Sequence, residues 1–342
     1  MIIKNKSKFA LVGHGFHLFE LYKELVKNNF PNPIIITHAK EKHYRDIRES
    51  NFDKNLYISV IELEKKTKVY YQDKLNFNSV LKILKKNNIE YIFSCSSRFI
   101  FKKDLLDLFK NRVFNIHPSH LPEEKGGGVF TYRIFNEKWF CTACIHLVDE
   151  GIDTGKILIK EKKFYIKKNS PPSKFLKETN KIYSILIKKF IKKIINQEKF
   201  LLKKQNSNLG TYFTRFFTDK MGFINWQLDG KSIANFILGC SKPYSGSSTF
   251  ILYKKKLTLI KIFKSKFIKL KKKFHPFFVG KIFFEDIKVI KVAVLDGYLV
   301  INKNDIFVKK QKIKNYLGKT LFNTQEKIIS SQTLIPNIND YK

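Results

Sequence analysis

Short apolar runs alternate with segments of helical periodicity through the first half of the chain. In residues 16–27, Leu18, Leu21 and Leu25 recur at three- and four-residue spacing, which predicts an amphipathic helix. Further helices are predicted over residues 77–86, 103–109, 128–136 and 173–196. Strands are predicted over residues 8–12, 33–37, 91–94, 113–115 and 140–148. Strands that alternate with helices indicate an α/β fold with a Rossmann-like, doubly wound and mostly parallel sheet.

The pattern changes after residue 204. Residues 205–210 are polar and predict a linker, and residues 211–322 predict a second domain followed by a tail over 323–342. We expect a short helix over residues 230–238 and strands over residues 248–253, 257–263, 277–284, 289–295 and 298–301. Short strands separated by turns are typical of a small β-barrel or sandwich. The Lys-rich residues 263–274 are interpreted as a solvated loop.

The charge balance is strongly basic, with 66 Lys+Arg against 29 Asp+Glu in 342 residues, for a net charge of +37. Only 6 of the basic residues are Arg and 60 are Lys. Arg is the side chain that recognises bases and phosphates bidentately, so this balance weakens a nucleic-acid interpretation. Abundant Lys, Asn, Ile and Phe also indicate A/T-rich codons, and such compositional drift explains the charge at least as well as function does.

The four cysteines are too few for a disulfide framework in a chain of this size. Cys141 and Cys144 match C-x-x-C, but they lie on a predicted strand, where residues three apart face opposite sides. We interpret them as core residues, and no second pair completes a zinc site. The chain also lacks a secretory signal and an apolar run long enough to span a membrane. We therefore expect a cytoplasmic protein without a metal ion or membrane insertion.

Gly13, His14 and Gly15 follow the first predicted strand, in the position of a dinucleotide-binding turn. The third glycine of that motif is missing, because position 18 is Leu18. The second strand ends at Thr37 without an acidic residue that could bind a ribose. We interpret the turn as a tight strand-to-helix connection.

Asn115, His117 and Asp153 form the constellation that suggests chemistry. Asn115 ends a predicted strand and His117 follows it, and residues two apart on an extended segment point the same way. An amide donor could stabilise an oxyanion, and an imidazole could hold a proton near neutral pH. Asp153 lies on a loop between Gly151 and Gly155, where it could orient His117. Each residue alone could also cap or brace a turn.

The stretch Asn-Ile-His-Pro-Ser-His-Leu-Pro over residues 115–122, with Asp-Glu-Gly-Ile-Asp-Thr-Gly over residues 149–155, resembles the folate-dependent formyltransferase family. The second domain resembles the OB-like C-terminal domain of this family at residues 222–226 and at Pro-Tyr-Ser-Gly over residues 243–246. Family members typically read Pro-Tyr-Pro-Gly there, so Ser245 is a mild departure. The resemblance implies that residues 1–204 form the catalytic domain.

The resemblance also implies a mechanism. N10-formyltetrahydrofolate would donate the formyl group, and a primary amine would attack it. Asn115 would donate to the oxyanion of the tetrahedral intermediate, while His117 and Asp153 would assist proton transfer. The pterin would bind between two segments, whose residues are Ser97, Arg98, Phe99, Ile100 and Phe101 in the first and Asp149, Glu150, Gly151 and Ile152 in the second.

The amine substrate separates two alternatives. Methionyl-tRNA formyltransferases carry a basic Gly-Arg-Gly-Lys-like loop after the second strand, and residues 37–45 are basic here but lack those glycines. The run Gly-Gly-Gly-Val-Phe-Thr-Tyr-Arg over residues 126–133 resembles the sugar N-formyltransferases. A nucleotide-linked amino sugar is therefore the expected substrate, and initiator Met-tRNA is the alternative. The expected substrate contacts are Ser119, Gly126, Gly127, Gly128, Tyr132 and Arg133.

Two further questions stay open at this point. The chain could be a folate- or nucleic-acid-binding module that kept the fold without activity, but the presence of Asn115, His117 and Asp153 argues against this. No motif sets the oligomeric state, and a homodimer is one open alternative.

Overall fold

The computed structural model describes residues 1–43, 47, 58–72, 77–97, 99–271, 273–308 and 313–335. Its first half is built on one sheet, whose strands are β1 (Phe9–Gly13), β2 (Ile34–Thr37), β3 (Val69–Tyr71), β4 (Tyr91–Cys95), β5 (Val113–His117), β8 (Cys144–Leu147) and β9 (Ile157–Lys160). The strand order is β3-β2-β1-β4-β5-β8-β9. The first five strands are parallel, and β8 and β9 are antiparallel to their neighbours. The predicted mostly parallel sheet is confirmed.

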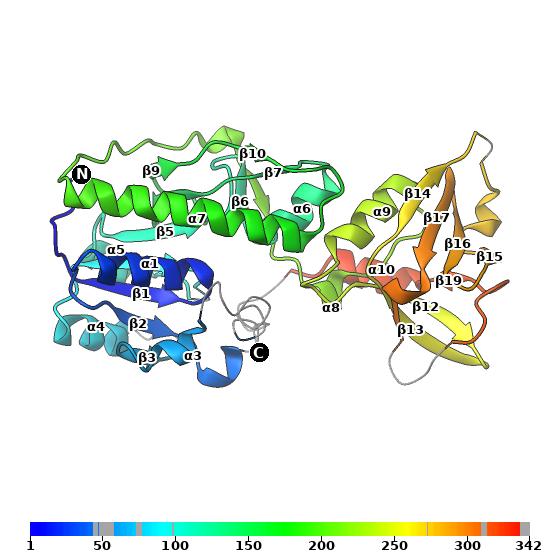
Figure 1. Ribbon diagram of the computed structural model, residues 1–342, viewed down its shortest axis with the longest axis horizontal. Helices are drawn as coiled ribbons and strands as arrows, with labels where there is room; N and C mark the ends of the chain where they lie inside the picture. Colours follow the sequence, from blue (N-terminus) through cyan, green and yellow to red (C-terminus); the bar gives the residue numbers. More distant parts are fainter. Residues whose placement is uncertain are drawn as a thin grey trace.

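Helices cover both faces of this sheet (Figure 1). One face packs against α1 (Phe16–Lys27) and the long helix α7 (Pro172–Ile195), in a core that includes Phe93 and Phe114. The other face packs against α4 (Phe77–Lys86) and α5 (Lys103–Leu108). Three short elements, η1 (Lys40–His43), α3 (Val60–Leu63) and α6 (Val129–Phe135), complete the helical part. The sheet is thus doubly wound, as its periodicity predicts.

Two predicted elements differ in the structure. The strand expected over residues 140–148 is split into β7 (Phe140–Cys141) and β8, and β7 pairs with β10 (Phe164–Tyr165) outside the main sheet. Thr142 and Ala143 separate the two strands and are buried, so apolar character alone did not reveal the break. The strand expected to end at residue 115 continues through His117. All four cysteines are free and buried, as their interpretation as core residues requires.

The turn after β1 has the tight geometry expected of a strand-to-helix connection. Gly13 adopts a φ of +126°, and a Cβ placed there would lie 2.0 Å from the Cys95 carbonyl oxygen. The His14 N–H donates to the same carbonyl at 2.9 Å, and α1 begins two residues later at Phe16. Glycine at position 13 therefore allows β1 to lie close to the end of β4.

The second half contains two four-stranded antiparallel sheets around their own core (Figure 1). One sheet has the order β18-β13-β12-β19, from β12 (Ser247–Tyr253), β13 (Lys256–Ile262), β18 (Ile306–Val308) and β19 (Leu321–Phe322). The other has the order β14-β17-β16-β15, from β14 (Lys266–Lys269), β15 (Ile282–Glu285), β16 (Val289–Val294) and β17 (Gly297–Asn302). The helical elements are α8 (Thr218–Met221), α9 (Gly230–Gly239), η3 (Pro276–Phe278), η4 (Lys303–Asp305) and α10 (Gln325–Gln332). This antiparallel β-domain agrees with the expected OB-like architecture.

The Lys-rich stretch over residues 263–274 is not simply a loop, because it contains β14. Phe267 on this strand packs against the core of the second domain. The high lysine content of the stretch did not indicate this apolar contact. The strand expected over residues 277–284 begins only at Ile282, after the short helix η3.

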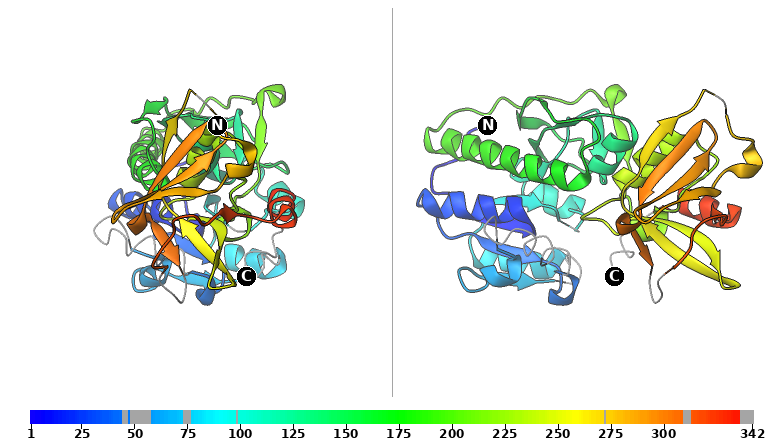
Figure 2. Two further views of the ribbon diagram at one scale, coloured as in Figure 1. Left: turned by 90° about the vertical axis from the view of Figure 1, so that its right-hand side faces the viewer. Right: turned by 45° about the vertical axis from the view of Figure 1, so that its right-hand side comes forward.

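The two halves are joined by a segment that pairs back onto the first half. After η2 (Ser207–Leu209), β11 (Thr211–Phe213) runs parallel to β6 (Glu124–Gly126). The halves also meet where α6 contacts α9, since the Thr131 hydroxyl donates to the Gly239 carbonyl at 3.1 Å. Figure 2 shows the two halves side by side along the long axis of the molecule. Among the described residues, the helices are too short or too polar to cross a bilayer.

Candidate active site

Strand β5 places Asn115 and His117 on one face of the sheet. Their neighbours Phe114 and Ile116 point to the opposite face and pack in the core beneath α1 and α7. Alternation along an extended strand thus fixes the direction of both polar side chains. The predicted pairing of an amide and an imidazole on one segment is observed, although His117 lies within the strand itself.

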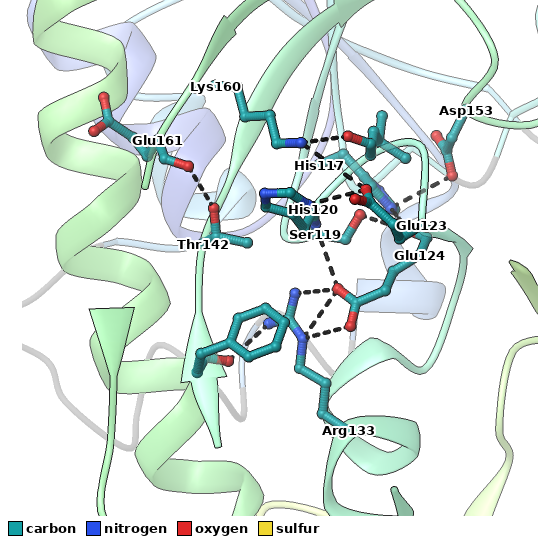
Figure 3. Close-up of polar contacts among 12 residues, drawn as sticks. His117, Ser119, His120, Glu123, Glu124, Arg133, Thr142, Asp153, Lys160 and Glu161 are labelled. Carbon is teal, nitrogen blue, oxygen red and sulfur yellow. Dashed lines mark hydrogen bonds and ion pairs between the residues drawn. The ribbon is translucent and has the colours of Figure 1, made fainter. Parts of the chain in front are cut away.

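The loop between β8 and β9 brings Asp153 onto these side chains. Figure 3 shows its carboxylate beside His117. Asn115 Nδ2 donates to Asp153 Oδ1 at 3.3 Å, and the Gly126 N–H donates to Oδ2 at 2.8 Å. His117 Nε2 lies 3.6 Å from Oδ2, and His146 Nε2 lies 3.4 Å from Oδ1. Four groups from three segments of the chain therefore converge on one carboxylate.

The surroundings of Asp153 favour its ionised form. Burial alone would raise its pKa, but the imidazoles of His117 and His146 and the Gly126 N–H hold the pKa well below the usual carboxyl range. Burial lowers the pKa of His117, and the Asp153 carboxylate offsets part of that effect. At neutral pH the pair is therefore a carboxylate beside a neutral imidazole.

Hydrogen-bond partners fix the proton on this imidazole. His117 Nε2 lies 3.2 Å from the Glu124 carbonyl oxygen and 3.6 Å from Asp153 Oδ2, and both of these atoms are acceptors. The proton of the neutral ring must therefore lie on Nε2. Nδ1 is then the nitrogen with a free lone pair, so it is the basic atom of the side chain.

His146 belongs to the site, and the sequence analysis did not identify it. Antiparallel pairing of β5 with β8 sets His146 opposite Asn115. Its Nδ1 lies 2.7 Å from the Leu147 carbonyl oxygen and carries the proton, so Nε2 accepts from Asn115 Nδ2 at 3.1 Å. A histidine in an otherwise apolar run, Cys-Ile-His-Leu, was the available signal, but only the strand register shows its partner.

The glycine turn, which consists of Gly126, Gly127 and Gly128, lies directly beside Asp153 and is also tightly packed. Gly126 adopts a φ of +89°, and a Cβ there would lie 2.2 Å from the Phe213 carbonyl oxygen. A Cβ on Gly127 would approach Arg215 Cα to 3.1 Å, and Gly128 has a φ of +67°. These glycines are therefore required by the segment that covers them, whatever else they contact.

Two expected substrate contacts, Arg133 and Ser119, have hydrogen-bond partners inside the protein, and their substrate roles stay predictions. Arg133 is buried, and its guanidinium binds the Glu124 carboxylate through Nε at 3.2 Å and through Nη2 (Figure 3). Its Nη1 donates to the Phe140 carbonyl at 3.1 Å. Ser119 is fully buried and donates to the Glu124 carbonyl. Both side chains hold the loop from the inside, because this loop would otherwise bury unpaired polar groups.

Tyr132 is half-buried on α6, against the segment that joins the two halves. Its hydroxyl lies 3.1 Å from Thr214 Oγ1, and its ring stacks on Phe213 at 4.7 Å between centroids. Its substrate contact stays a prediction.

The segments expected to bind the pterin lie after β4 and in the loop that carries Asp153. Ser97 Oγ accepts from the Phe99 N–H at 3.0 Å, Ile100 is 60% exposed, and Phe101 is buried beside α5. Arg98 lies outside the described residues. The residues of the second segment are exposed, and they are Asp149, Glu150, Gly151 and Ile152. The predicted binding roles stay predictions.

Comparison with known proteins matches both halves of the chain. The formyl transferase family matches residues 6–182, and the formyl transferase C-terminal domain matches residues 217–319. The chain belongs to the formyl transferase family. It is therefore an enzyme that transfers formyl groups.

Two curated relatives and one solved structure place this formyltransferase more closely. A methionyl-tRNA formyltransferase of Clostridium tetani is 28% identical over 254 residues, covering 74% of this chain and 78% of the relative. That of Rickettsia canadensis is 30% identical over 220 residues, covering 64% and 69%. An N-formyltransferase of Helicobacter canadensis, solved with folinic acid and dTDP-3-aminofucose, shares the fold with a TM-score of 0.62. It is 23% identical and covers 86% of this chain and 98% of that one.

Replacing Asp153 should change both the rate and its pH dependence. The rate of formyl transfer should fall as acid protonates His117, with a midpoint below about 6.5 because burial lowers its pKa. Asp153→Asn removes the carboxylate that favours the imidazolium, so this midpoint should move to lower pH. The rate at neutral pH should also drop by about a hundredfold. The check is kcat/KM against pH, with the exposed Asp107→Asn as control; an unmoved midpoint would contradict the pairing.

Removing Arg133 should destabilise the fold rather than only weaken substrate binding. Arg133→Met leaves the buried Glu124 carboxylate without its cation, which should cost about 3–5 kcal/mol in unfolding free energy. Urea denaturation measures this cost, and the surface arginine variant Arg112→Met is the matched control. Similar midpoints for the two variants would argue against the ion pair as a structural element.

Proposed function

We propose that this formyltransferase transfers the formyl group of N10-formyltetrahydrofolate to the primary amine of a nucleotide-linked amino sugar. The observation that carries this proposal is the position of the glycine turn. Gly126 donates to Asp153 Oδ2, so the first residue of the glycine turn adjoins the carboxylate that we propose acts in the reaction. A sugar amine could approach this backbone closely. The related Helicobacter canadensis enzyme was solved with dTDP-3-aminofucose, which supports the same substrate class.

The residues around the site fit a folate donor. Ile100 and Ile152 are 60% and 55% exposed, and they lie on the two segments expected to bind the pterin. Exposed apolar side chains of this kind provide contact surface for a flat ring, while backbone groups supply the polar contacts. Folinic acid in the Helicobacter canadensis enzyme supports this assignment.

The chain's own groups would act on the proton and the developing charge. The folate donor supplies the formyl carbon that the amine attacks. His117 Nδ1, the basic ring nitrogen, would accept the proton that the amine loses. The Asp153 carboxylate would stabilise the resulting imidazolium. That proton would pass to N10 of the folate as the bond between N10 and the formyl carbon breaks, which releases tetrahydrofolate.

Asn115 must exchange a hydrogen bond to stabilise an oxyanion. Both of its amide hydrogens have acceptors in this structure, Asp153 Oδ1 at 3.3 Å and His146 Nε2 at 3.1 Å. We propose that the longer bond, to Asp153, is the one exchanged when negative charge develops on the formyl oxygen. His146 would keep the amide pointed at the reacting carbon during the exchange.

Initiator Met-tRNA is the second candidate substrate. The curated relatives from Clostridium tetani and Rickettsia canadensis are methionyl-tRNA formyltransferases, and the net charge of +37 would attract a polyanion. Residues 37–45 lack the glycines of the tRNA-binding loop, and Tyr44 and Arg45 lie outside the described residues.

A substrate panel decides between the two amines. Tetrahydrofolate release should be fast with one of the dTDP-, UDP- or GDP-linked amino sugars and undetectable with charged initiator tRNA. KM for the sugar should rise only gently with salt, whereas tRNA binding, which neutralises many phosphates, should weaken steeply. Turnover with tRNA alone would make the sugar proposal wrong.

Asn115→Ala tests the proposed oxyanion contact with whichever amine is turned over. Loss of one oxyanion donor should lower kcat by about a hundredfold or more. KM should change little, because the contact forms only as charge develops. A variant that retained full turnover would remove Asn115 from the mechanism.

A further inference from the structure

The segment that joins the two halves attaches to the active site at several points. Lys203 exchanges two backbone hydrogen bonds with Ile157, each 2.9 Å long, at the start of β9. Farther along, β11 pairs with β6, and the Gly127 N–H donates to the Phe213 carbonyl at 2.9 Å. Gln205 lies between these two attachments.

The carboxamide of Gln205 binds the backbone of the loop that carries Asp153. Its Nε2 donates to the Asp153 carbonyl at 2.8 Å and to the Gly155 carbonyl at 2.7 Å. Both partners are acceptors, so the orientation of the amide is fixed. Its Oε1 is then buried without a hydrogen-bond partner among the described residues. Such an orphaned acceptor destabilises the fold, which indicates that the amide is kept for what Nε2 does.

The backbone that Gln205 holds is in an unfavourable conformation. Asp153 has a φ of +54°, in the left-handed region that residues with a side chain seldom adopt. The neighbouring Gly155 packs so tightly that a Cβ there would overlap the Leu147 carbonyl oxygen. A strained conformation persists only where surrounding contacts impose it, and the two Gln205 bonds act on this stretch directly.

We propose that Gln205 is a positioning residue for formyl transfer. Its carboxamide holds Asp153 in the left-handed conformation from which the carboxylate reaches His117, Asn115 and the Gly126 N–H. This inference rests on the proposed role of Asp153 in the reaction. The joining segment also supplies the second restraint, because β11 holds the glycine turn whose N–H binds Oδ2. One stretch of chain, residues 203–213, thus supports Asp153 from both sides.

Three substitutions at position 205 separate donation from packing. Gln205→Met keeps the bulk but removes the donor, and kcat should fall about ten- to a hundredfold with KM nearly unchanged. Gln205→Glu is close to isosteric but sets an acceptor against two carbonyl oxygens, so its kcat should fall at least as far. Gln205→Lys restores a donor and should retain most of kcat. The exposed neighbour Lys204→Ala is the control and should behave as the parent enzyme.

A titration of His117 tests the same inference without any amine substrate. The Asp153 carboxylate raises the pKa of His117 and so opposes the effect of burial. If Gln205→Met frees Asp153 from this position, the pKa of His117 should fall. The parent enzyme and Lys204→Ala provide the comparison. Histidine ¹⁵N chemical shifts against pH give this pKa directly. If no amine is turned over, the proposed function fails while this readout still decides the role of Gln205.

The inference is overturned by either of two results. One is an unchanged His117 titration and kcat in the folded Gln205→Met variant. The other is equal loss of kcat in the Met and Lys variants, which would show that packing rather than donation matters. Circular dichroism and a urea midpoint for each variant establish that it is folded.

Discussion

The Asp153 carboxylate is the interaction on which the rest of the site depends. A buried carboxylate is costly unless hydrogen-bond donors surround it, and here the donors come from β5 and the glycine turn. The His146 imidazole of β8 lies 3.4 Å from the same carboxylate and accepts from Asn115. These elements are far apart in the sequence, and the fold must bring them together before the Asp153 carboxylate gains its hydrogen bonds. The low pKa of the carboxylate follows from that arrangement, whereas burial lowers the pKa of His117 and keeps its imidazole neutral.

Local periodicity predicted a mostly parallel sheet and the facing of Asn115 and His117, although strands β3 and β9 were not predicted. Both features depend on residues close together in the chain, since alternation along one strand decides which side chains share a face. His146 and Gln205 could not be found this way. Their partners lie 31 and 52 residues away, and a strand register or a loop path sets such contacts. No local pattern encodes either.

Two motif residues that bond inside the protein show a related limit. Ser119 and Arg133 stand in the recognisable stretch, so proximity in sequence favoured a role in binding the substrate. Each instead bonds to Glu124, one through its hydroxyl to the backbone and one through its guanidinium to the carboxylate. A loop that crosses the interior must pair its own polar groups before it can present others. Polar residues of a motif can therefore serve the loop rather than the ligand.

The parallel pairing of β11 with β6 has a consequence for how this enzyme is made. Residues 124–126 leave the ribosome long before their partners at residues 211–213, so the glycine turn lacks its cover during most of synthesis of the first half. The long sequence separation also makes this pairing a late and slow folding event. The nascent first half can form its sheet, but a mature catalytic geometry arises only once the chain has entered its second half. The glycine turn and the Asp153 carboxylate that it binds therefore gain their full set of contacts only after the junction has been translated.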